Sequence, residues 1–203
     1  MVATMRAIDE TLPTADGVAW FNKLYLRVTE SVEDSLGRGS AFRDPSFLPR
    51  LDVVFANLYF DALREASRGE TGAPRAWLPL IESRARPDVA PLQFALAGMN
   101  AHINRDLPLA LADTWTELRR RPKLGGPEHA DFIRVNVLLA ETEAQVKVWF
   151  ADGFVGVVDR TFGNLDDVLA IWNVARARDA AWTNGEALLA IRGDPDLTSA
   201  FLL

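Results

Sequence analysis

An apolar run from Leu92 to Met99 constrains the fold of this chain more than any other stretch. It is apolar on nearly every side of a helix, and such a helix must be enclosed by others. The run leads into Asn100-Ala101-His102-Ile103-Asn104-Arg105-Asp106, which contains two amides, an imidazole, a guanidinium and a carboxylate. Each polar group left unsatisfied in a buried place costs about 1–3 kcal/mol. The sequence therefore predicts an internal hydrogen-bond network or a functional site here.

The other apolar residues recur at helical spacings of three and four. We therefore expect an all-α fold, a single-domain bundle of about six or seven helices over residues 1–203, with Leu92 to Asp106 as its central helix. Residues 1–13 are expected to be poorly ordered, Pro108 should bend or interrupt its helix, and Phe154 to Phe162 could be a strand. The further expected helices are Asp16 to Leu36, Ser46 to Ser67, Pro74 to Ser83, Leu109 to Arg121, Glu128 to Phe150 and Asn164 to Ile191.

Composition excludes several classes of protein. Acidic residues outnumber basic ones 28 to 22, which argues against nucleic acid as a partner. The absence of cysteine excludes disulfides and cysteine–zinc sites. The first residues lack a signal-peptide pattern, and no apolar run approaches the ~18 residues of a membrane span. We therefore expect a cytoplasmic, bacterial chain that works without a membrane, and a small molecule as its partner.

His102 and Asp106 are the first candidates for catalysis. Four residues apart on a helix, they share one face, so the carboxylate can accept a hydrogen bond from an imidazole N–H. This contact would fix the tautomer of the imidazole and raise its basicity, as in a general acid–base pair. The same pair could equally be a satisfied core contact. Asn104 pairs in the same way with Asn100 and is a candidate to bind substrate.

The helix expected from Ser46 carries a similar pattern in Phe55-Ala56-Asn57-Leu58-Tyr59-Phe60-Asp61. Asn57 and Asp61 are four apart among large apolar residues. If they face inward, Asp61 is a second candidate for proton transfer, and Asn57 and Tyr59 are candidates to bind substrate. An exposed Asn/Asp stripe is the other interpretation of this spacing.

Two later helices supply the remaining candidates. His129 and Asn136 share a helix face, so His129 is a candidate for proton transfer and Asn136 for substrate binding. Arg178 and Trp182 are four apart, which lets the guanidinium lie along the indole. Arg178 is thus a structural residue or a partner for an anionic group of the substrate.

A metal site is an open alternative. The two histidines, with Asp61, Asp106, Asp131 or Glu143, could form a nitrogen and oxygen ligand set for a divalent metal. The chain has no His-Glu-x-x-His and no paired Glu-x-x-His, however. We therefore expect no cofactor, while keeping a metal-dependent hydrolase or oxygenase that uses His102 and His129 as an alternative.

The run Phe94 to Leu107 resembles the hallmark of the DUF5995 family, mostly bacterial proteins without an assigned function. The similarity extends to Phe55-Ala56-Asn57-Leu58-Tyr59, to the eight residues from His129 to Asn136, and to Arg178-Asp179-Ala180-Ala181-Trp182. The resemblance implies an all-helical single domain. It also brings the polar clusters and the Arg178 helix into one pattern, which favours a shared internal site. A place in natural-product biosynthesis is a further suggestion of this resemblance.

These patterns lead to two hypotheses besides the metal enzyme. The first is an enzyme without an organic cofactor that performs acid–base chemistry on a largely apolar small molecule: isomerisation, cyclisation, elimination or hydration. His102 would act as base or acid, and Asp106 would orient it. The second is a non-catalytic ligand-binding or interaction protein, in which the His102 network is only part of the core.

Overall fold

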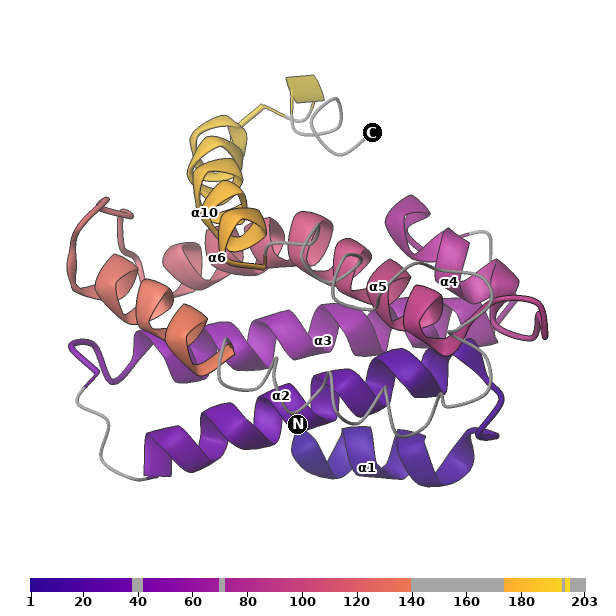
Figure 1. The fold of residues 1–203 in the computed structure, drawn as a ribbon. Helices are drawn as coiled ribbons and strands as arrows, with labels where there is room; N and C mark the ends of the chain where they lie inside the picture. The colour runs from indigo at the N-terminus through magenta and orange to yellow at the C-terminus, as the bar shows by residue number, and fades with distance from the viewer. Residues whose placement is uncertain (38–41, 70–71, 140–173, 195, 198–203) are drawn as a thin grey trace. The chain divides into compact units, whose positions relative to one another are not determined.

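The chain is all-α in the computed structural model, which describes residues 1–37, 42–69, 72–139, 174–194 and 196–197. The described residues contain no strand, so the predicted fold class is confirmed. The expected strand at Phe154 to Phe162 lies outside the described residues. No helix among the described residues is long and apolar enough to cross a membrane. The α-helices delimited there are α1 (Val2–Thr11), α2 (Gly17–Gly37), α3 (Phe47–Ser67), α4 (Leu78–Ser83), α5 (Pro91–Ala101), α6 (Leu107–Glu117) and α10 (Val174–Ile191) (Figure 1).

The chain divides into two compact units that draw on alternating parts of the sequence. Unit 1 comprises the described residues of Met1–Ser40, Pro79–Gly98 and Arg134–Ala175. Unit 2 comprises those of Ala41–Leu78, Met99–Ile133 and Arg176–Leu203. Since the division falls between Gly98 and Met99, α5 begins in unit 1 and ends in unit 2.

In unit 1, α1 packs on α2. The sequence led us to expect a poorly ordered start, but α1 is held because Met5 is fully buried and its carbonyl accepts a 2.9 Å hydrogen bond from Asn22. Asp16 caps the start of α2, because its carboxylate accepts a 2.8 Å hydrogen bond from the amide of Val18. Arg84 fixes the same carboxylate through two nitrogens, at 2.9 and 2.6 Å from one oxygen.

In unit 2, α3 packs on α6 and on the helical segment that precedes α6. The expected helix from Ser46 to Ser67 is confirmed as α3, with Leu51, Ala56, Tyr59 and Ala62 buried. The short helix expected at Pro74 to Ser83 begins as a 3-10 turn, Arg75–Trp77, and continues as α4. A further helical segment covers residues 127–139 and corresponds to the described part of the helix expected from Glu128.

Gly98 permits a close approach of α5 to α2 within unit 1. A Cβ atom built on Gly98 would lie 2.4 Å from Cγ and 2.8 Å from Cβ of Phe21, which is itself buried. The Phe21 ring could rotate, but its Cβ is fixed to the backbone of α2. Only glycine therefore fits at this position without a shift of one helix.

We predict that Gly98→Ala lowers the free energy of unfolding by about 1–3 kcal/mol, the usual cost of overpacking a core. The gain in helix propensity on replacing glycine, about 1 kcal/mol, is smaller than the upper part of this range. Denaturant titration of the two proteins measures the difference. Gly193→Ala is the matched control, because no described atom lies within 4 Å of its Cβ position. Equal stability of Gly98→Ala and wild type would contradict the close approach.

The end of α6 contains a residue in the left-handed region. Arg119 has φ 53°, and the amides of Arg119 and Arg120 bond back to the carbonyls of Thr116 and Trp115 at 3.1 and 2.8 Å. This pair of bonds is a Schellman motif, whose left-handed position favours glycine. Arg119 therefore carries strain that a Cβ atom imposes there.

We predict that Arg119→Gly raises the free energy of unfolding by roughly 0.5–1 kcal/mol, since it removes the strain at positive φ. Arg121→Gly, two residues further on and also exposed, should give no such gain. Thermal and denaturant unfolding of both variants measure the effect. A loss of stability in Arg119→Gly would show that the Arg119 side chain outweighs the strain.

Candidate active site: a buried histidine–aspartate pair

His102 to Asp106 form a π-helical turn between α5 and α6, in place of the simple bend expected at Pro108. Pro108 lacks an N–H, and in an α-helix its ring would clash with the carbonyl of Asn104. The wider turn instead closes with a bond from the amide of Leu107 to the carbonyl of His102. The chain thus stays helical through the proline, and such single π-helical turns are frequent at functional sites.

The predicted pairing of His102 with Asp106 is confirmed. Nδ1 of His102 lies 3.0 Å from Oδ2 of Asp106, and their side chains are 3% and 0% exposed. Since a carboxylate only accepts hydrogen bonds, the proton of the neutral imidazole is on Nδ1. The basic lone pair is therefore on Nε2, the nitrogen turned away from the carboxylate.

Asp106 receives two further donors, and neither was among the predicted site residues. Trp77 donates its indole N–H to Oδ2 at 3.0 Å, and Arg105 donates to Oδ1 at 2.6 Å. The Arg105 guanidinium is about 29% exposed, whereas the indole of Trp77 is fully buried. Together with the imidazole, these donors compensate a charge that has no access to water.

Burial lowers the pKa of His102 below its ordinary value of about 6.5, despite the opposing effect of Asp106. The sequence led us to expect raised basicity, and desolvation of the charged imidazole outweighs that effect. The imidazole is consequently neutral at neutral pH.

Three aromatic rings surround His102 within unit 2. The ring of Phe55 is stacked on the imidazole, with centroids 3.6 Å apart and planes 7° from parallel. Tyr59 meets it edge-on at 6.1 Å, and Trp77 is tilted at 5.9 Å. Tyr59 was a predicted site residue; Phe55 could have been found one helical turn before it, on the same face of α3.

The other candidates on these helices are placed away from the His102–Asp106 pair. Asp61 is 49% exposed and forms a 2.6 Å ion pair with Arg64. Asn57 is exposed, so the exposed Asn/Asp stripe describes α3 better than an inward-facing one. Asn104 is also exposed and donates to Asn100 at 2.6 Å. The role of Asp61 in proton transfer and the roles of Asn57 and Asn104 in substrate binding remain predictions that the geometry does not support.

His129 and Arg178 belong to a second aromatic cluster of unit 2. The imidazole of His129 meets the ring of Trp182 edge-on, with centroids 4.8 Å apart. The guanidinium of Arg178 lies 4.2 Å from the ring centroid of Phe132 and donates to the Phe132 carbonyl at 3.1 Å. Burial lowers the pKa of Arg178 to about 10, against the opposing charges of Asp52 and Asp179.

Asn136 is half-buried and belongs to unit 1, whereas the His102–Asp106 pair belongs to unit 2. His102 and His129 have different ring neighbours in the described structure. Among the described residues, no three His, Asp or Glu side chains gather as a metal ion would require.

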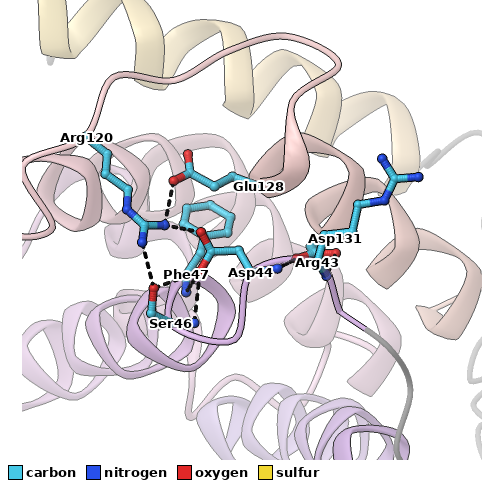
Figure 2. A network of polar contacts seen from close by, with 7 residues as sticks. All are labelled: Arg43, Asp44, Ser46, Phe47, Arg120, Glu128 and Asp131. Carbon is cyan, nitrogen blue, oxygen red and sulfur yellow. Dashed lines mark hydrogen bonds and ion pairs between the residues drawn. The ribbon is translucent and has the colours of Figure 1, made fainter.

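A separate polar network joins the start of α3 to the start of the helix at 127–139 (Figure 2). The carboxylate of Asp131, 2% exposed, accepts the backbone amides of Arg43 and Asp44 at 2.8 and 2.7 Å. Asp44 in turn accepts the amides of Ser46 and Phe47 at 3.0 and 3.3 Å, and so caps α3. Asp131 is therefore buried because it holds the backbone of residues 43 and 44 in place before α3.

Arg120 completes this network. It pairs with Asp44, and it donates to Glu128 at 2.9 Å and to Ser46 at 3.1 Å. Burial tends to raise the pKa of Asp44, but the hydrogen bonds from Ser46 and Arg120 lower it overall. Arg120 is thus the cation that links the carboxylates of Asp44 and Glu128 (Figure 2).

The fold and site together define an all-α protein with a buried, carboxylate-bound histidine. The family model described as "Family of unknown function (DUF5995)" matches residues 1–201, so the chain belongs to this family. Comparisons with curated proteins and with solved structures found no match.

We predict that His102 remains neutral as the pH falls below 6.5, with its proton on Nδ1. In the unfolded chain its imidazole takes up a proton near pH 6.5. The free energy of unfolding is therefore highest above that pH and falls as the pH drops from 6.5 towards the lower pKa of the folded state. The slope is at most about 1.4 kcal/mol per pH unit.

Nitrogen-15 NMR of the imidazoles between pH 5 and 8 measures both the tautomer and the pKa. The chain has two histidines, so His129→Gln assigns the His102 signals. Protonation of His102 at or above pH 6.5, or a proton on Nε2, would contradict the assignment.

Proposed function

We propose that this chain is an enzyme in which His102 acts as a general base on a largely apolar small molecule, without an organic cofactor. The observation that carries the proposal is the bond from Nδ1 of His102 to Asp106. It fixes the tautomer with a basic Nε2 and holds the ring in orientation, which is what acid–base catalysis requires.

The lowered pKa of His102 favours reactions in which a proton is taken and returned. Nε2 would accept a proton from a C–H or O–H group of the substrate, and Asp106 would stabilise the imidazolium that results. Because burial disfavours the charged form of the ring, this imidazolium is acidic and gives its proton back readily. Isomerisation, cyclisation, elimination and hydration all fit such a cycle.

The surroundings of His102 support an apolar substrate. Phe55, Tyr59 and Trp77 present rings rather than charges to the imidazole. A desolvated base surrounded by hydrocarbon also discourages side reactions with water. The carboxylate that His102 contacts, Asp106, is already paired with Arg105.

We predict that His102→Gln reduces proton abstraction by about 10²–10⁴-fold, the usual contribution of a general base. The assay incubates the protein with a panel of apolar ketones and conjugated alkenes in D₂O and follows deuterium incorporation by mass spectrometry. Glutamine can still donate to Asp106, so the fold is preserved while the base is lost.

Val53→Ala is the control, since Val53 lies on α3, as Phe55 does, but is 42% exposed. It should exchange deuterium at the wild-type rate. Full exchange in His102→Gln, or no exchange above background with the wild-type protein, would refute the proposal.

A further inference from the structure

One face of the His102 imidazole is covered by the ring of Phe55. With centroids 3.6 Å apart and planes 7° from parallel, the two rings are in van der Waals contact, and no other group fits between them. His102 is itself only 3% exposed. A ligand that touches this face of the imidazole must therefore take the place of the Phe55 ring.

Phe55 is the neighbour of His102 that is easiest to move. Trp77 is fully buried and its N–H binds Asp106, so its movement would leave a buried carboxylate without a donor. Tyr59 is fully buried and stacked on Trp77 at 5.4 Å. The side chain of Phe55 is only half-buried and is a hydrocarbon, so displacing it breaks no side-chain hydrogen bond.

We propose that Phe55 covers a ligand site, and that a flat apolar group, an aromatic ring or a conjugated system, displaces the Phe55 ring and stacks on His102. This inference rests on the proposed function and adds the class of substrate to it. The space that Phe55 vacates has the thickness and shape of one aromatic ring. The rings of Tyr59 and Trp77 lie 6.1 and 5.9 Å from the imidazole, so a flat group stacked on His102 would join a cluster of aromatic rings.

The position of the base defines how such a molecule would react. The lone pair of Nε2 lies in the plane of the imidazole, whereas the stacked group lies parallel to that plane. The flat group is thus the binding part, and the reacting atom extends past its edge towards Nε2. A substituted ring or a conjugated chain meets this requirement.

Diethyl pyrocarbonate, which acylates neutral imidazole nitrogens, tests whether Phe55 is the cover. The chain has two histidines, and peptide mass spectrometry distinguishes them. In the wild-type protein His102 should react much more slowly than the half-buried His129. Phe55→Ala should accelerate the reaction of His102 by about tenfold or more, because the reagent no longer depends on the half-buried Phe55 ring moving away, and should leave His129 unchanged.

Phe60→Ala is the matched control. Phe60 is also a half-buried ring on α3, and it contacts Tyr59 at a centroid distance of 5.4 Å. Its removal should leave the rate at His102 unchanged. Phe55→Leu is the second variant, in case Phe55→Ala does not fold: leucine keeps apolar bulk but not the flat cover, so it should give a smaller acceleration. If the folded Phe55 variants leave His102 as slow as in wild type, the proposal is overturned.

Toluene and methylcyclohexane test the preference for a flat group. In Phe55→Ala, toluene should restore the slow reaction of His102, and methylcyclohexane of nearly equal size should do so less. Equal protection by both would overturn the flat-group preference. If Phe55→Ala exposes His102 but deuterium exchange survives in His102→Gln, the ligand site stands and the catalytic role falls. If Phe55→Ala leaves His102 as slow as in wild type but His102→Gln abolishes deuterium exchange, His102 is the base and the proposed ligand site is wrong.

Discussion

The burial of the Asp106 carboxylate is the constraint on which the arrangement of unit 2 depends. Its side chain has no exposure to water, so its charge must be compensated from within the protein. His102 and Arg105 supply donors from the same helical turn, and Trp77 supplies one from a 3-10 turn 29 residues earlier. The carboxylate thereby fixes both the tautomer of the imidazole and the position of the Trp77 segment on the π-helical turn.

The sequence predicts the parts of this site that depend on local spacing. The bounds of α2 and α3 follow from apolar residues that recur at spacings of three and four, and the start of α2 follows from Asp16 as its cap. The contact between His102 and Asp106 also follows from spacing, since residues four apart share a helix face. Pro108 indicates an irregular turn, but the rule that proline breaks an α-helix does not say whether the helix bends there or forms a wider, π-helical turn.

The remaining features depend on contacts between distant segments, which leave little trace in spacing. Nothing near Trp77 in the sequence shows that its N–H binds Asp106. The stripe of Asn57 and Asp61 is compatible with either face of α3, and the packing of the opposite face decides that it is exposed. Arg178 donates a hydrogen bond to the carbonyl of Phe132, 46 residues earlier in the chain, and the spacing of residues within its own helix gives no sign of this contact.

A purely structural role would not require a histidine at position 102. A glutamine amide could donate to Asp106 equally well, and it would avoid the desolvation that depresses the pKa of the imidazole. The network around Arg120 shows how this fold treats a structural charge: every partner is an opposite charge, a hydroxyl or a backbone amide. Position 102 differs, because it places a titratable lone pair and a flat aromatic face among hydrocarbon rings. Those two properties are useful to a base that binds a flat substrate, and they contribute little to a core.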